Sequence, residues 1–141
     1  MRAAEYLGQI GRLDARINNK LREKQQIMEL ATKVTPTLSD MPRGEGVTDK
    51  VANAVARLVT VEREIDQIID RLVDTRAEVV ALLEMLPHDE YLVLHAYYVT
   101  DLTVEAIADT MGKSVRQVYR IKSRAMRHVQ AILDERDKGR G

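Results

Sequence analysis

The side chains best suited to specific contacts lie in one basic stretch near the end of the sequence. Six Lys or Arg and no acid occur between Lys113 and Ala131, whereas Glu84 to Gly112 holds six acids and no Lys or Arg. Arginine can form paired hydrogen bonds with guanine, and glutamine can do so with adenine. The chemistry expected here is therefore recognition of nucleic acid, although a solvated charged helix face would give a similar run of charges.

Two helices joined by a tight turn are predicted to position these basic side chains. Thr103 can cap a first helix, and Gly112 can take the left-handed conformation that ends it. Ser114 and Gln117 have the spacing of a capping box for the next helix. The pattern predicts a helix-turn-helix whose second helix, from Ser114 to about Gln130, enters a major groove.

Side chains near the start of the second helix are expected to reach base edges, and the others to hold phosphates. The predicted base contacts are Ser114, Arg116, Gln117 and Arg120. The predicted phosphate contacts are Lys113, Tyr119, Lys122, Arg124 and Arg127. Partial burial of Tyr119 is an equally good interpretation of that residue.

No catalytic pattern accompanies the basic stretch. The sequence has no cysteine, and His88, His95 and His128 lack the spacing of metal ligands. It has no glycine-rich phosphate loop and no nucleophile elbow. We therefore expect a protein that is not an enzyme and has no cofactor, metal or small-molecule substrate. Without cysteines, a signal peptide or a membrane-spanning run, a cytoplasmic location with no membrane contact is expected.

Two long helices are predicted to precede the helix-turn-helix. The first runs from Arg2 to about Val34, and a loop follows from Thr35 to Val47. Gly8 and Gly11 weaken this helix, and they are expected to mark a frayed end rather than to permit the close approach of another helix, which is the alternative. The second begins at Thr48 or Asp49 and is ended by Pro87. Its apolar positions alternate four and three apart, which is typical of a coiled coil, at Val51, Val55, Leu58, Glu62, Ile65, Ile69, Leu72, Arg76, Val79, Leu83 and Leu86.

Folding these helices into an antiparallel hairpin would set Lys20 against Glu62 and Ile17 against Ile65. A two-helix hairpin leaves apolar surface uncovered, so a homodimer is predicted, as in a four-helix bundle. Antiparallel pairing of two copies about Ile69 would place Glu62 opposite the second copy's Arg76. The predicted oligomerisation residues are Leu58, Glu62, Ile65, Ile69, Leu72 and Arg76.

The expected fold class is all-α, with the hairpin followed by a small helical bundle. A short and almost wholly apolar helix from Asp89 to Tyr98 is expected to form the centre of that bundle. The predicted domains are residues 1–86 for oligomerisation and residues 87–133 for DNA binding. Residues 134–141 are predicted to be a frayed polar tail.

The C-terminal part of the sequence resembles region four of bacterial sigma factors. The resemblance rests on Leu86-Pro87, Tyr91 to Leu94, Tyr97 to Val99, Leu102-Thr103, Ile107-Ala108, Met111-Gly112, Ser114, Val118 and Arg124-Ala125. The whole chain resembles the ArpU/RinA type of phage late-gene activator, through Leu13-Asp14, Ile17 to Lys20 and Arg116 to Arg120. The basic aromatic segment with which sigma factors melt promoters has no counterpart here.

The resemblance implies a DNA-binding activator or accessory protein at a phage or prophage promoter, in the cytoplasm of a bacterial host. Two alternatives remain open from the sequence. Small terminase subunits also join a helix-turn-helix to helical hairpins, so a ring-forming DNA-packaging adaptor is one. The other is a protein-interaction module, in which the acidic stretch from Glu84 to Gly112 contacts a partner such as RNA polymerase.

Overall fold

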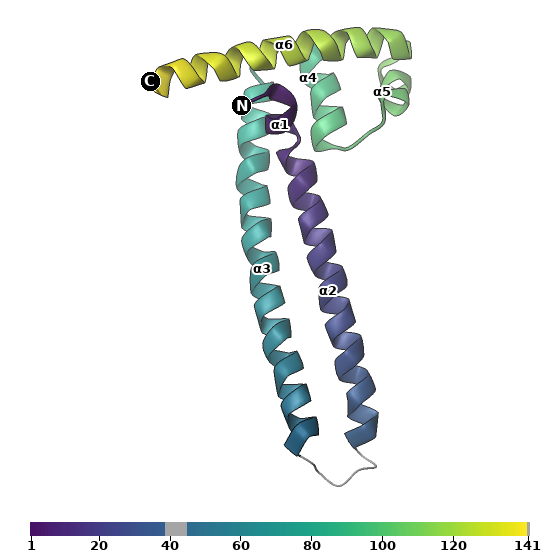
Figure 1. Cartoon of the computed structure of the whole chain (residues 1–141). Coiled ribbons are helices and arrows are strands. Elements are labelled where there is room, and N and C mark those ends of the chain that lie inside the picture. Colours follow the sequence, from purple (N-terminus) through teal and green to yellow (C-terminus); the bar gives the residue numbers. More distant parts are fainter. Residues whose placement is uncertain (39–44, 141) are drawn as a thin grey trace. The chain divides into compact units, whose positions relative to one another are not determined.

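The computed structural model describes residues 1–38 and 45–140, and every regular element within them is a helix (Figure 1). The predicted all-α fold is confirmed. The elements are α1 (Ala3–Leu7), α2 (Gln9–Leu38), α3 (Glu45–Leu83), α4 (His88–Leu94), the π-helical turn η1 (His95–Val99), α5 (Val104–Met111) and α6 (Val115–Arg140). The predicted loop was too long, because Thr35 to Leu38 and Glu45 to Val47 are helical; the rest of it lies outside the described residues.

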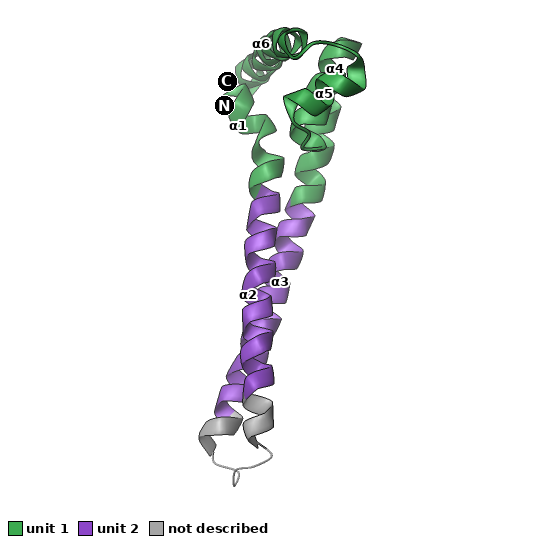
Figure 2. Ribbon diagram, turned by 90° about the vertical axis from the view of Figure 1, so that its right-hand side faces the viewer, with its two compact units in different colours: residues 1–12, 72–141 green, residues 13–71 purple. Residues whose placement is uncertain are grey.

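The chain divides into two compact units that differ from the predicted domains (Figure 2). Unit 1 combines residues 1–12 with residues 72–141, and unit 2 is residues 13–71. Both ends of the predicted hairpin domain, residues 1–12 and 72–86, therefore belong to the unit that carries the helix-turn-helix. The reason lies in the core of unit 1, which buries side chains from both of these segments.

Unit 2 is an antiparallel pair of helix segments joined along a narrow aliphatic seam. Its α3 segment packs Leu58, Val61, Ile65 and Ile68 inward, three and four residues apart, and α2 contributes Ile27. The predicted seam is thus wrong at alternate positions, since Glu62 and Ile69 are exposed. The observed seam has the lower desolvation cost, because Val61 takes the place predicted for a charged glutamate.

Ion pairs fix the register of the hairpin in unit 2. Lys20 pairs with Glu64, and the Lys24 ammonium lies 3.3 Å from a Glu62 carboxylate oxygen. The predicted pairing of Lys20 with Glu62 is therefore wrong: the partner of Lys20 lies two residues further along α3, and the partner of Glu62 lies four residues further along α2. The hydrogen bond from Lys20 to Glu64 raises the pKa of this lysine, so the ammonium stays charged.

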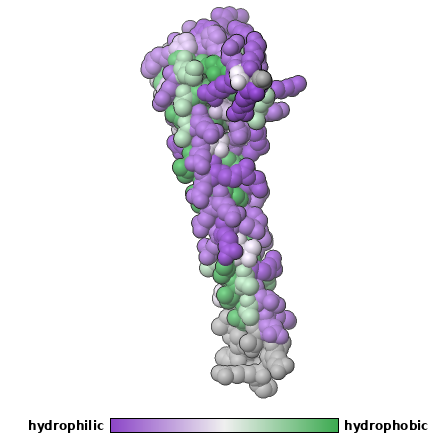
Figure 3. All heavy atoms as spheres, turned by 90° about the vertical axis from the view of Figure 1, so that its left-hand side faces the viewer, coloured by the Kyte–Doolittle hydropathy of each residue, from purple (hydrophilic) through white to green (hydrophobic). Residues whose placement is uncertain are grey.

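Aliphatic side chains also reach the surface, as the green spheres along the hairpin in Figure 3 show.

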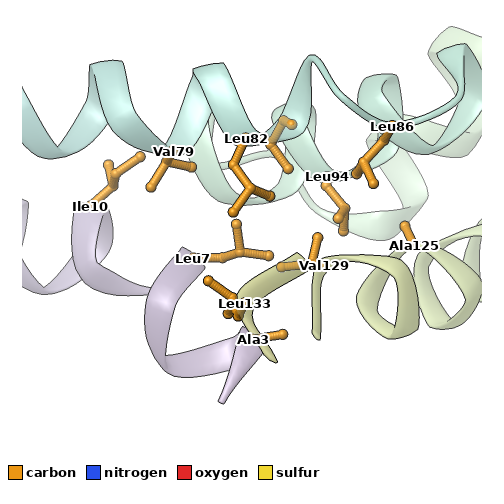
Figure 4. Packing of buried hydrophobic residues seen from close by; sticks show 11 residues of the cluster. Ala3, Leu7, Ile10, Val79, Leu82, Leu86, Leu94, Ala125, Val129 and Leu133 are labelled. Atoms are coloured by element: carbon orange, nitrogen blue, oxygen red, sulfur yellow. The ribbon is translucent and has the colours of Figure 1, made fainter. Parts of the chain in front are cut away.

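Unit 1 is built around a core to which five of the described helices contribute. Side chains from α1, α2, α3, α4 and α6 point toward one another in Figure 4, and several of them are completely enclosed. The buried members are Ala3, Leu7, Ile10, Val79, Leu82, Leu83, Leu86, Leu94, Ala125, Val129 and Leu133. The C-terminal half of α6 is consequently a core element, and the start of the chain is packed against it.

Gly8 interrupts the first predicted helix and separates α1 from α2. A Cβ at this position would lie 2.9 Å from the Ala4 carbonyl oxygen, so the close backbone approach requires glycine. Two side chains satisfy the carbonyls beside the interruption: Arg12 Nη2 donates to the Glu5 oxygen at 2.6 Å, and Gln9 Nε2 to that of Tyr6 at 2.9 Å. The prediction of a frayed start is wrong, because these contacts and the buried Leu7 fix α1 in place.

The predicted frayed tail is also wrong within the described residues, since α6 continues to Arg140. Leu133 anchors this extension in the core. Gln130 connects it to the start of the chain: its Oε1 accepts from the Ala3 amide at 2.8 Å and its Nε2 donates to the Met1 carbonyl at 3.2 Å. The first bond satisfies an amide that has no partner within α1.

One acidic side chain is buried where α4 meets α6. Glu90 on α4 is 1% exposed, and its carboxylate accepts from Arg124 Nε at 3.0 Å and contacts His128 Nδ1 at 2.5 Å. Arg124 Nη2 also donates to Asp89 at 2.7 Å. The hydrogen bond that Arg124 donates to Glu90 raises the pKa of Arg124, and Asp89 adds to the effect. These bonds fix how far α6 is turned about its own axis.

The two glycines near the start of the chain should respond oppositely to alanine. We expect Gly8→Ala to destabilise unit 1 by about 1–3 kcal/mol, because the new Cβ meets the Ala4 carbonyl. Gly11→Ala should stabilise it by about 0.5–1 kcal/mol, since no atom lies within 4 Å and alanine favours the helix. Urea unfolding followed by circular dichroism measures both. Equal effects would contradict the close approach at Gly8.

Replacing the buried carboxylate should also destabilise unit 1. We expect Glu90→Ala to lower the free energy of unfolding by about 1–3 kcal/mol, because Arg124 and His128 lose a common partner. Glu90→Gln keeps an acceptor oxygen and should cost less. Glu78→Ala, an exposed glutamate of α3 in the same unit, is the matched control and should change stability by less than about 0.5 kcal/mol. Thermal denaturation of the three variants measures these differences. If Glu90→Ala is no less stable than Glu78→Ala, the Glu90 carboxylate does not stabilise unit 1.

Candidate nucleic-acid interface

The turn between α5 and α6 has the geometry predicted from its capping residues. The Thr103 hydroxyl accepts from the Ala106 amide at 3.2 Å, and Gly112 adopts φ 65° and ψ 33°, in the left-handed region. Ser114 Oγ accepts from the Gln117 amide at 3.1 Å, while Gln117 Oε1 accepts from the Ser114 amide at 2.8 Å. The capping box is complete, so the direction in which α6 leaves the turn is fixed locally.

A second core cluster fixes which face of α6 is turned inward. Val118 and Ile121 are buried with residues of α4 and α5, and Ala125 and Val129 continue the same face into the larger core. The residues packed against α6 in the second cluster are Val93, Val104, Ile107 and Ala108. With this stripe enclosed, the basic positions of α6 must lie on the opposite face.

That opposite face carries a shallow basic depression of about 450 Å³. It is lined by Arg116, Tyr119, Arg120, Ser123, Arg124 and Arg127, which recur three and four residues apart along α6. Arg116, Arg120 and Arg127 form no ion pair or hydrogen bond with side chains in the described ranges, so their guanidinium groups are available to a ligand. Tyr119 is 52% exposed, so its side chain is partly covered and partly accessible to a ligand.

The four predicted base contacts divide into two pairs. Arg116 and Arg120 lie in the basic depression with their charges unpaired in the described chain. Ser114 and Gln117 lie at the exposed start of α6, but their side chains are bonded to each other's backbone in the capping box. The Gln117 amide nitrogen has no partner among the described residues, so it is the group most available for a base contact.

The predicted phosphate contacts are also of two kinds. Lys113 and Arg127 are exposed without a partner among the described residues. Lys122 lies on a different face, with its ammonium 4.5 Å from the centroid of the Tyr97 ring and 5.9 Å from that of Tyr98. Arg124 lines the depression but is held by Glu90 and Asp89. Burial raises the pKa of Tyr98, so this phenol is neutral beside Lys122.

Two features of unit 1 were not predicted from the sequence. Ser123 lies between Arg120 and Arg127 in the depression, and its helical spacing from both could have revealed it. The second feature is an apolar groove of about 330 Å³ between η1 and α5. Its lining residues are Leu92, His95, Ala96, Thr100, Leu102, Ile107, Thr110 and Met111. Their apolar character is visible in the sequence, but their proximity depends on how the helices pack.

Neither a metal site nor a membrane span is found in the described part of the chain. No three residues among its histidines, aspartates and glutamates are placed to hold a metal ion. None of its helices combines the length and hydrophobicity that crossing a bilayer requires.

A match to a known protein family falls on the interface just described. Residues 82–131 match the family model of sigma-70, region 4, over about a third of the chain. The matched segment contains the buried Glu90, the α5 to α6 turn and the basic depression. No curated protein and no solved structure matches the sequence. Residues 82–131 are therefore similar to sigma-70 region 4, which is a DNA-binding module.

Proposed function

We propose that this protein is a sequence-specific, DNA-binding regulator of transcription that places the start of α6 in a major groove. The observation that carries the proposal is the basic depression, where three arginines without partners in the described chain line one exposed helix face. The buried stripe on the other side holds that face outward. The region 4 match supports the same role.

Within this proposal, Arg116 and Arg120 read base edges, together with Ser114 and Gln117 at the first turn of α6. The phosphate contacts are made by Lys113, Tyr119, Lys122, Arg124 and Arg127. Lys113 and Arg127 contribute most of the affinity for the phosphate backbone, because Lys122 and Arg124 already have partners within the chain. We propose further that two copies associate through the hairpin and bind two half-sites. The resemblance to ArpU/RinA-type proteins supports activation of phage or prophage late genes as the biological role.

Mapping the binding sites of the protein on its host genome tests the proposed role. Sites immediately upstream of promoters would support an activator, and sites overlapping promoters would support a repressor. A single site near a packaging origin, together with a ring of many subunits, would support the packaging adaptor instead.

Two arginines of the depression should affect DNA binding differently. Arg120→Ala should weaken binding to the selected site by roughly 1–3 kcal/mol and relax the preference at one base pair. Arg127→Ala should weaken binding to all sequences alike and reduce the slope of log K against log salt concentration by about 1. Fluorescence anisotropy with specific and scrambled duplexes, over a range of salt concentrations, separates the two effects.

Arg136→Ala is the matched control, since this exposed arginine also belongs to α6 but lies outside the depression. Its affinity and salt dependence should equal those of the unmodified protein. If all three variants bind alike, α6 does not dock through the depression and the proposal is wrong.

The apolar groove favours contact with RNA polymerase as a second function of the same unit. Leu92 and Leu102 expose more than a third of their surface at its edge, and no Lys or Arg occurs from Glu84 to Gly112. A polymerase segment with apolar side chains flanked by basic ones would fit such a groove. Leu102→Asp should then abolish binding to purified polymerase without changing DNA affinity, whereas Met85→Asp, at an exposed methionine outside the groove, should leave both intact.

A further inference from the structure

The hairpin of unit 2 leaves a row of aliphatic side chains in solvent on one face. Leu21 and Met28 of α2 are 46% and 44% exposed, and Val55, Val59 and Ile69 of α3 are 52%, 51% and 40% exposed. The seam between the helices encloses other residues, chiefly Ile27, Val61 and Ile65. An exposed apolar surface of this extent indicates an interface.

The ion pair between Lys24 and Glu62 shows that these five residues share a face. Leu21 and Met28 lie three residues before and four after Lys24, on the same side of α2. Val59 lies three residues before Glu62 on α3. Val55 lies seven residues before Glu62, and Ile69 lies seven residues after it. Because Lys24 and Glu62 meet at 3.3 Å across the hairpin, their aliphatic neighbours on both helices flank the same bridge. We call these five residues and the bridge the aliphatic face.

We propose that the aliphatic face binds a second copy of this chain, with α2 of each copy lying on α3 of the other. The inference rests on the proposed dimeric DNA-binding function and gives it a defined surface. It also changes the residues expected at the interface. Leu58 and Ile65 are used within the chain's own hairpin, whereas Leu21, Met28, Val55 and Val59 were not among the predicted oligomerisation residues.

Charge complementarity identifies the occupant as a second copy and fixes the arrangement. From Arg16 to Lys24, α2 has four basic residues and one acid; from Glu62 to Asp70, α3 has four acids and one basic residue. Within one chain these segments already attract each other, through Lys20 with Glu64 and Lys24 with Glu62. Stacking α2 on α2 would bring like charges together, while stacking α2 on α3 repeats the favourable pairing in a closed two-fold dimer.

The arrangement places the two hairpins parallel to each other. A two-fold axis along the bundle keeps each α2 antiparallel to the α3 of the other copy, as it is to the α3 of its own chain. The acidic segment around Glu62 then lies between two basic segments, one from each copy. The aliphatic side chains meet in the centre of the four-helix bundle, which is the part of such a bundle that excludes water.

The full-length chain can be tested directly by sedimentation equilibrium. Met28→Lys combined with Val59→Lys should raise the dimer dissociation constant by about 100-fold, because two cations would be placed in an apolar interface. Leu30→Lys is the matched control: this leucine is 57% exposed in the same unit but lies off the aliphatic face, and its variant should dimerise normally. Circular dichroism confirms that each variant remains helical.

Disulfide trapping tests the arrangement, since the chain has no cysteine of its own. Mixing Met28→Cys protein with Val59→Cys protein should give a cross-linked dimer containing one copy of each. Efficient cross-linking of Met28→Cys with itself would overturn the α2-on-α3 arrangement. Three results would overturn the proposal that the aliphatic face is the interface. They are a monomeric parent protein, a ring of many subunits, and a dimer that is lost only in the Leu30→Lys variant.

A separate measurement distinguishes failure of this inference from failure of the proposed function. The lysine double variant should still bind a duplex carrying one half-site, with a dependence on Arg120 like that of the parent protein. If the parent dimerises through the aliphatic face but binds no DNA at low salt, the DNA-binding proposal fails and the interface stands. If DNA binding depends on Arg120 while the parent protein is monomeric, the proposed interface fails and the DNA-binding proposal stands.

Discussion

The carboxylate of Glu90 is the interaction on which the orientation of the DNA-binding helix depends. A charge that is 1% exposed is stable only when it is fully bonded, and Glu90 has its partners on one element, α6. Apolar packing alone would allow α6 to rotate or slide slightly against α4. Two polar contacts of defined length do not allow it, so the basic depression is held at one angle to the rest of unit 1.

Helix α6 serves two purposes along its length. One face of its N-terminal half carries the arginines of the depression, and its inner face supplies Ala125, Val129 and Leu133 to the core shared with α1 and α3. Arg124 lies near the start of this core-forming stretch and is bonded to Glu90. Because one continuous helix joins the exposed contacts to the core, the recognition residues inherit the rigidity of the best-packed part of the chain.

Sequence reasoning was most successful where the interactions are local. Thr103, Gly112, Ser114 and Gln117 act within four residues of themselves, so their spacing alone predicts the turn. It failed where the choice depends on distant partners. Both Val61 and Glu62 fit a four-three pattern, and only packing against α2 selects Val61.

The same limit explains two other differences. Arg124 appeared free for phosphate because its partner, Glu90, is thirty-four residues away. Gly8 appeared to mark a frayed end because the close approach to Ala4, and the burial of Leu7 against residues of α3 and α6, cannot be seen in a linear pattern. The extent of α6 was underestimated because the tail is polar, while its anchor, Leu133, depends on the start of the chain.

The placement of aromatic residues gives the two units separate optical signals. All five tyrosines, at positions 6, 91, 97, 98 and 119, belong to unit 1, and the chain contains no tryptophan. Ultraviolet fluorescence and near-ultraviolet dichroism of the unlabelled protein therefore come from unit 1 alone, whereas the far-ultraviolet signal of the backbone adds both units. Melting of the hairpin segment ahead of the DNA-binding unit, or the reverse, would be resolved in a single titration without any introduced probe.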